Sequence, residues 1–260
     1  AFDKDLDEVV ALKVMKANHI EDDDINQFKE EIRVARRISH PNVVRIHDFG
    51  QLASNVYISM EFVQGYTMEQ ILKYTKKLRP IAARHAAINI CEGLMAAHES
   101  GVVHKDLKPA NIMLTELGGE EDFVKVLDFG IAKLLSDEAE DLTRTGQSVL
   151  TVEYAAPEQV LGGAVTVATD VYALGVLLYE LLTGSTPFSA RDLRSAAFGE
   201  LQRIIREVDP PRPSTRLSHS TETLPELARS RHVEPTRLSR IIRGDLDWIV
   251  MKCLEKDRSR

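Results

Sequence analysis

The sequence predicts an α+β fold in two parts. Residues 1–63 combine short β-branched runs with one amphipathic helix, whereas helical patterns dominate from residue 64 to residue 260. A length of 260 residues fits one large domain or two lobes packed together. We therefore expect a small β-rich part followed by a larger, mainly helical part.

The first part is expected to form a small sheet with one helix. The run V-V-A-L-K-V-M at residues 9–15 indicates a strand with Lys13 in its middle. Apolar residues recur at three- and four-residue steps from Ile25 onward, which predicts one helix to about Ser39. Two further strands joined by a loop are expected at residues 43–49 and 56–62.

The second part is expected to be built mainly from helices. Helices are predicted at residues 67–76, 80–100 and 167–182, and short strands at residues 112–114 and 124–127. Residues 208–234 belong to a Pro/Arg-rich insertion near residues 208–243 and are rich in Pro, Ser, Thr and Arg. This composition predicts an exposed loop with at most a brief helix.

Composition and charge argue against several classes of protein. A net charge of −7 disfavours nucleic acid as a partner, and no apolar stretch approaches the roughly 20 residues of a membrane span. Cys91 and Cys253 lack the spacing of a disulfide framework or a zinc site. We expect no membrane contact by this segment, and a cytoplasmic protein or the cytosolic domain of a membrane-anchored receptor.

The run H-K-D-L-K-P-A-N at residues 104–111 carries the main chemical signal. Asp106 can accept a proton, Asn111 can hold a cation, and Lys108 between them can neutralise a phosphate oxygen. Asp128 opens a D-F-G turn seventeen residues later and offers a second oxygen ligand. Two oxygen ligands on two loops suit Mg²⁺ that carries phosphates.

With these motifs, the chain resembles the eukaryotic-type (Hanks-type) serine/threonine protein kinases, in particular their bacterial branch. V-A-L-K at residues 10–13, H-K-D, D-F-G, A-P-E at residues 156–158 and D-V-Y-A-L-G-V at residues 170–176 follow the order of the family. The resemblance implies a two-lobed kinase-like fold with an antiparallel small lobe. It also implies transfer of the γ-phosphoryl group of ATP to protein Ser/Thr hydroxyls.

The resemblance assigns roles to the charged residues. Lys13 holds the α- and β-phosphates with Glu31 as its ion-pair partner, and Asp106 acts as the base beside Lys108. Asn111 and Asp128 are the implied ligands of Mg²⁺, which Mn²⁺ can replace. The Gly-rich phosphate loop is missing before Val10, so we expect a chain truncated at both ends that lacks the first strands of the fold.

Further roles follow from the same alignment of motifs. The adenine is expected to contact Ala11, Met60, Glu61, Phe62, Val63 and Met113. His104 and Phe129 are expected to be structural neighbours, and Asp170 to brace the catalytic loop from below. His98 and His85 are interpreted as packing or surface residues.

The segment between D-F-G and A-P-E implies regulation. Thr143 and Thr145 are the expected autophosphorylation sites, which a transient homodimer could serve, and Thr151 is expected to link the substrate-facing loop to Asp106. Lys105 replaces the usual arginine of H-R-D, which weakens phosphate binding there because lysine makes no bidentate contact. Glu158 of A-P-E is expected to lack its arginine partner.

Two other functions stay open at this point. A pseudokinase or scaffold would keep the fold without turnover; the missing Gly-rich loop favours it, and the retained Lys13, Asp106, Asn111 and Asp128 oppose it. A small-molecule phosphotransferase would share the spacing of the aspartate and asparagine. The A-P-E motif and the helix that follows it favour protein substrates instead.

Overall fold

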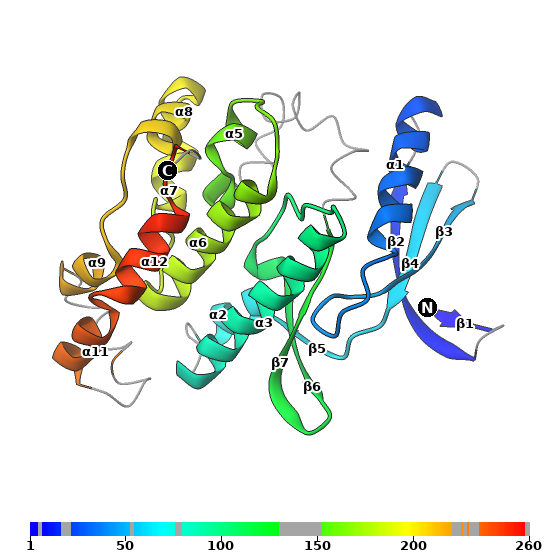
Figure 1. The fold of residues 1–260 in the computed structure, drawn as a ribbon, viewed down its shortest axis with the longest axis horizontal. Helices are drawn as coiled ribbons and strands as arrows, with labels where there is room; N and C mark the ends of the chain where they lie inside the picture. The colour runs from blue at the N-terminus through cyan, green and yellow to red at the C-terminus, as the bar shows by residue number, and fades with distance from the viewer. Residues whose placement is uncertain are drawn as a thin grey trace.

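The structure is a computed structural model that describes most of the chain (Figure 1). The described residues are 1–4, 7–16, 22–52, 55–75, 80–129, 152–219, 225, 228 and 234–257. A small sheet with one helix forms one side of the molecule, and a larger helical part forms the other (Figure 1). The two-part organisation follows the order predicted from the sequence.

The first sheet has four antiparallel strands in the order β1-β2-β4-β3. The strands are β1 (Phe2–Asp3), β2 (Glu8–Lys16), β3 (Ile46–Leu52) and β4 (Asn55–Glu61). Strands β3 and β4 pair as far as Leu52 and Asn55, so the loop between them is shorter than predicted. In the register of β2 and β4, Lys13 lies opposite Ile58.

Helix α1 (Asp22–Ala35) covers one face of this sheet (Figure 1). Its Phe28 and Ile32 are buried against Val56 and Ile58 of β4, which accounts for the apolar spacing of the helix. The helix ends four residues before the predicted Ser39. The chain tightens there into a turn with bonds between residues three apart, such as Ile38 N to Ala35 O.

A second, three-stranded antiparallel sheet belongs to the larger part. It contains β5 (Gly65–Thr67), β6 (Ile112–Leu117) and β7 (Glu120–Val126) in that order. Strand β6 is longer than predicted, because Gly118 and Gly119, with φ of 62° and 83°, join it directly to β7. Two consecutive residues with positive φ form the tight turn that β-hairpins prefer.

Three predicted helices surround the main core. They are α2 (Met68–Thr75), α3 (Pro80–Glu99) and α6 (Val167–Thr183). Leu94 of α3, Leu177 of α6 and Ile112 of β6 are buried together. Helix α6 begins at the Thr166 cap and ends at Gly184, whose φ of 80° suits a helix terminus.

Within the insertion near residues 208–243, the described residues include two brief helices and are more buried than predicted. Beyond α6 the chain forms α7 (Ala190–Ser195), α8 (Phe198–Glu207), α9 (Pro213–His219), α11 (Pro235–Ile242) and α12 (Asp245–Cys253). Leu217, Leu238 and Ile242 form a buried cluster, and both Ser214 N and its hydroxyl donate to the buried Asp247 carboxylate. The sequence analysis did not foresee this burial, because α9 and α11 bury apolar residues against each other and against Leu182 of α6 and Leu246 of α12.

The segment that follows α1 joins the two parts of the molecule. Asn42 Nδ2 donates to Val124 O at 2.8 Å, and Val44 N donates to Val126 O at 3.0 Å. Val43 also forms a parallel bridge with Val126 of β7. The small sheet is thereby anchored beside the strand that leads to Asp128.

Candidate active site

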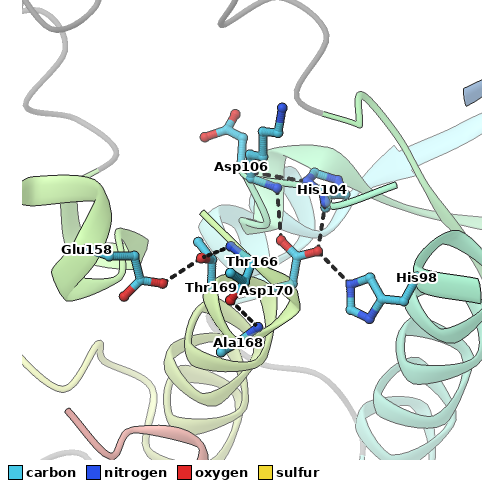
Figure 2. A network of polar contacts seen from close by, with 9 residues as sticks. His98, His104, Asp106, Glu158, Thr166, Ala168, Thr169 and Asp170 are labelled. Atoms are coloured by element: carbon cyan, nitrogen blue, oxygen red, sulfur yellow. Dashed lines mark hydrogen bonds and ion pairs between the residues drawn. The ribbon is translucent and has the colours of Figure 1, made fainter. Parts of the chain in front are cut away.

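The backbone of the 104–111 loop is held by one buried carboxylate. Asp170, in the first turn of α6, accepts hydrogen bonds from His104 N at 2.7 Å and from Lys105 N at 2.8 Å (Figure 2). Lys105 has a φ of 67°, a backbone conformation that residues other than glycine seldom adopt. The structure therefore brings Asp170 to the loop that it was predicted to brace.

His98 belongs to the same network, contrary to its interpretation as a packing or surface residue. Its Nε2 lies 2.8 Å from Asp170 Oδ2 (Figure 2). The two residues come from α3 and α6, and 72 positions separate them in the chain. No local pattern in the sequence could signal this contact, because it depends on the packing of two helices.

His104 is buried and lies beside Phe129, as expected of structural neighbours. Their ring centroids are 4.7 Å apart. His104 Nε2 lies 2.8 Å from Leu127 O, while Nδ1 accepts from Asp106 N at 3.2 Å. Burial lowers the pKa of His104 and outweighs the opposite effect of Asp170, so the ring is neutral and orients the loop.

Lys108, predicted as catalytic, and Asn111, predicted as a metal ligand, both contact Asp106. Lys108 Nζ lies 2.8 Å from Asp106 Oδ2, and Asn111 Nδ2 donates to the same oxygen at 3.0 Å and to Asp106 O at 2.8 Å. The short helical turn η1 (Pro109–Asn111) carries Asn111, which is buried. Because the amide nitrogen of Asn111 makes these bonds, its oxygen is the atom left to serve as a metal ligand.

Lys13 meets Asp128 across the boundary of the two sheets. Lys13 Nζ lies 2.8 Å from Asp128 Oδ2, and both side chains are about one third exposed. Asp128 has a φ of 52°, which turns the chain sharply after β7. Because this ion pair is partly exposed, it can open, and Lys13 can then bind an anion while Asp128 binds a cation.

A cavity of about 320 Å³ opens beside this pair. The expected adenine contacts all line it, namely Ala11, Met60, Glu61, Phe62, Val63 and Met113. Its wall also includes Lys13 and Asp128, so an apolar section adjoins a charged one. This combination fits a ligand with a flat apolar base and charged phosphates.

A second cavity of about 480 Å³ lies on the Lys108 side of the catalytic loop. Its lining includes Tyr154 and Glu180, which the sequence analysis did not single out. The Tyr154 hydroxyl donates to Glu180 Oε2 at 2.5 Å, and burial raises the pKa of Glu180. Lys108 thus stands between Asp106 and a surface recess that could receive another molecule.

The expected Lys13–Glu31 ion pair does not occur between these two described residues. Glu31 instead pairs with Lys105, whose Nζ lies 3.1 Å from Oε1 and 3.3 Å from Oε2. The expectation was wrong because Lys13 takes Asp128 as its partner and the lysine of H-K-D extends to α1. Sequence spacing places these four charges in one region without deciding which of them pair.

Glu158 accepts a hydrogen bond from α6, and its expected lack of an arginine partner stays a prediction because residues 258–260 lie outside the described residues. Its Oε1 accepts a hydrogen bond from the Thr169 hydroxyl, and that hydroxyl also accepts from Thr166 N in the cap of α6 (Figure 2). Glu158 itself lies in α5 (Pro157–Val160). The neighbouring Gln159 donates to Lys105 O at 2.7 Å, which ties the A-P-E segment to the catalytic loop.

The expected regulatory threonines lie outside the described residues. Thr143, Thr145 and Thr151 belong to the segment 130–151, of which the structure gives no description. Their roles therefore stay predictions.

The donor atoms present suit a hard divalent cation. Asp106, Asn111 and Asp128 supply carboxylate and amide oxygens, the ligands that Mg²⁺ and similar ions prefer. Among the described residues no cluster of three or more His, Cys, Asp or Glu side chains forms a site of the zinc type. The described helices also include none long and apolar enough to cross a bilayer.

Comparison with known protein families identifies the family of this chain. The family model described as "Protein kinase domain" matches residues 1–260. The chain belongs to the protein kinase family. The group around Asp106 and the cavity at Lys13 are therefore parts of a kinase domain. Proteins of this family use ATP and a divalent metal to phosphorylate proteins.

Curated relatives of this kinase domain are bacterial and carry serine/threonine in their names. The serine/threonine-protein kinase pkn3 of Myxococcus xanthus is 39% identical over 227 residues, which are 84% of this chain and 41% of the relative. The probable PknB of Corynebacterium glutamicum is 35% identical over 82% of this chain and 32% of its own length. PrkC of Bacillus subtilis is 37% identical over 76% of this chain and 30% of its own length.

The kinase domain therefore spans well under half the length of these relatives. Their names confirm the resemblance to the bacterial serine/threonine branch. A crystal structure of the kinase domain of Mycobacterium tuberculosis PknI, determined on a point mutant, matches with a TM-score of 0.61 at 24% identity. It covers 96% of this chain and 78% of the other, and it confirms the α+β, two-lobed kinase fold.

Proposed function

We propose that this chain transfers the γ-phosphoryl group of ATP to serine and threonine hydroxyls of protein substrates. The observation that carries the proposal is the group at Asp106, whose Oδ2 has Lys108 Nζ at 2.8 Å and Asn111 Nδ2 at 3.0 Å. Lys108 lines the second recess, whereas Lys13 and Asp128 line the first cavity. A donor nucleotide and an acceptor protein could thus approach the same carboxylate from two sides.

Each side chain has a task that its chemistry supports. Asp106 orients the attacking hydroxyl and accepts its proton, while Lys108 offsets negative charge on the transferred group. Lys13 binds nucleotide phosphates once it leaves Asp128. The neutral His104 and the buried Asp170 keep the loop in place without touching the reacting atoms.

Asn111 and Asp128 would hold the metal ion, which we infer to be Mg²⁺, with Mn²⁺ as a substitute. When bound, the ion would supply neutralisation of charge on the phosphate oxygens. Adenine would lie between Ala11 and Met113, next to the segment Met60–Val63. The oxygen character of the donors and the shape of the cavity support this assignment.

Regulation and cellular context are further parts of the proposal. We infer autophosphorylation at Thr143 and Thr145 within a transient homodimer, and work in the cytoplasm or on the cytosolic side of a membrane-anchored parent protein. Thr143 and Thr145 lie between the D-F-G and A-P-E motifs, and this position supports autophosphorylation there. Phosphopeptide mapping after incubation with ATP measures it directly.

The test of the main proposal is transfer from labelled ATP in the presence of Mg²⁺ to a general acceptor protein. We expect phosphoserine or phosphothreonine, and a fall in turnover of about 10² to 10⁴ for Asp106→Ala because the base is lost. Asp245→Ala, which removes an exposed aspartate at the start of α12, is the matched control. Its turnover should equal that of the wild type.

Two outcomes would contradict the proposal. Transfer that survives in Asp106→Ala at the wild-type rate would exclude Asp106 as the base. Complete absence of transfer by the wild type, with Mg-ADP still bound, would favour a scaffold that keeps the nucleotide site without turnover.

A further inference from the structure

Lys256 contacts neutral groups where the other half-buried lysines of the described chain contact carboxylates. Its Nζ donates to the Tyr172 hydroxyl at 3.0 Å. The same atom lies 5.0 Å from the ring centroid of Tyr172 and 5.0 Å from that of Phe188, within the range of a cation–π contact. Four other lysines with buried or half-buried side chains are ion-paired with carboxylates, namely Lys13, Lys105, Lys108 and Lys125.

The surroundings of the Lys256 amine are largely apolar. Lys256 follows α12, which lies beside α6 (Figure 1). Tyr172 of α6 is buried in one cluster with Ala156 of the A-P-E segment and with Leu254. Phe188 belongs to the short connection between α6 and α7. The amine is thus enclosed by two aromatic side chains and half removed from water.

These surroundings favour the neutral amine more than a carboxylate partner would. A phenol oxygen and two rings replace only part of the hydration that an ammonium ion loses on burial. Burial therefore lowers the pKa of Lys256 to about 8, although the exposed Asp209 acts in the opposite direction. Burial also raises the pKa of Tyr172, so the phenol stays neutral and adds no negative charge beside the amine.

We propose that Lys256 is a site of acyl modification, at which its amine takes an acyl group from a small acyl phosphate or acyl thioester. The neutral nitrogen attacks the carbonyl carbon and forms a C–N bond, while the C–O bond to phosphate or the C–S bond to sulfur breaks. The leaving group departs as phosphate or thiolate, and the proton lost by nitrogen passes to water. A desolvated lysine is a nucleophile suited to this reaction.

The product is a neutral amide, which changes the contacts of this segment. An amide carries no charge and loses the electrostatic attraction to the rings of Tyr172 and Phe188. The added acyl group must also find space beside the buried Tyr172. Acylation of Lys256 therefore loosens the end of the described chain from α6, close to Ala156. The inference is independent of the proposed function, because it requires neither a nucleotide nor a metal ion.

The test compares Lys256 with Lys252 in the same molecule. Lys252 is exposed, lies four residues earlier and is paired with Glu255 at 2.9 Å. The folded 260-residue chain is incubated at about pH 8 with acetyl phosphate in one arm and acetyl-CoA in the other. Cleavage after Glu255 separates the two lysines for mass spectrometry. We expect Lys256 to be acetylated about tenfold faster than Lys252 or more, because more of its amine is neutral.

Two further measurements show whether the fold causes this difference. In concentrated urea the two lysines should react at equal rates, because water surrounds both. In the folded chain the rate at Lys256 should level off above about pH 8, whereas the rate of an ordinary exposed lysine rises to about pH 10. The arm with the faster reaction identifies the acyl donor, phosphate or thioester.

Lys256→Gln imitates the neutral amide and tests the effect on the fold. It should lower the midpoint of urea unfolding, whereas Lys252→Gln should leave the midpoint nearly unchanged. Should Lys256→Gln fail to fold, the rates in the wild type still decide on the site.

Three outcomes would overturn the inference. Equal acetylation of the two lysines in the folded chain, or no acetylation of Lys256 by either donor, would refute the site. A ratio of rates that stays the same in urea would show that the fold does not activate Lys256. An unchanged midpoint for Lys256→Gln would refute the loosening of the segment from α6.

Discussion

The two sides of the kinase active site are held by different kinds of contact. On the side of the large lobe, the catalytic loop is tied to Asp170, which is 1% exposed and accepts two backbone hydrogen bonds in addition to its contact with His98. On the side of the small lobe, Lys13–Asp128 and Lys105–Glu31 are ion pairs with side chains about one third exposed.

This difference indicates which part of the site is fixed and which can change. Buried hydrogen bonds cost much to break because the donors left behind stay unsatisfied, whereas exposed ion pairs are screened by water. The backbone around Asp106 is therefore fixed before any ligand binds. If Lys13 binds phosphate as proposed, its ion pair with Asp128 must first open.

Asp170→Ala gives the largest expected loss of stability. It leaves the buried N–H of His104 and the partly buried N–H of Lys105 without their acceptor, so the free energy of unfolding should fall by about 3 kcal/mol. Urea unfolding followed by circular dichroism measures this loss, with Asp245→Ala as the exposed control. A loss below about 1 kcal/mol would show that the loop is held by other contacts.

The pH dependence of stability sharpens the same comparison with a smaller effect. Burial lowers the pKa of His104. Below about pH 6.5 the imidazole therefore binds a proton in the unfolded chain but stays neutral in the folded chain. The stability from the neutral ring is complete above that pH and is lost as pH falls, by up to about 1.4 kcal/mol per pH unit. Unfolding at pH 7.5 and 5.5 should show a shallower dependence for His104→Asn, and equal slopes would contradict the neutral buried ring.

Lys13→Met has the smallest expected effect on stability and a clear effect on binding. Loss of the partly exposed pair with Asp128 should change the free energy of unfolding by less than about 1 kcal/mol. Loss of the charged contact to phosphate should weaken Mg-ADP by about tenfold or more. If instead the variant unfolds, Lys13 belongs to the fixed side of the comparison.

Local patterns accounted for most of the fold. The apolar spacing of α1, the proline and glycine at the two ends of α3, and the apolar run of α6 predicted helices that the structure contains. The hairpin between β6 and β7 was underestimated, although Gly118-Gly119 is a turn signal that could have extended both strands. The burial of α9 and α11 was missed because it depends on their packing against each other, against Leu182 of α6 and against Leu246 of α12.

In the candidate site too, contacts between residues close in the chain were predicted, whereas contacts between distant residues were not. Asp106, Lys108 and Asn111 lie within six residues of one another, so their motif almost dictates that they meet. The cavity lining from Ala11 to Met113 also agrees with the resemblance. The partner of Glu31, the role of His98 and the partner of Glu158 did not follow from any motif.

The family and the two-lobed fold could be predicted from the sequence alone, because they depend on residue types at short spacing and on local apolar patterns. Only the tertiary structure decided that Glu31 pairs with Lys105 and that His98 supports Asp170. These partners are 74 and 72 residues apart. Charges so distant in the chain pair according to how helices and sheets pack, and several carboxylates and amines brought into one region compete until packing selects among them.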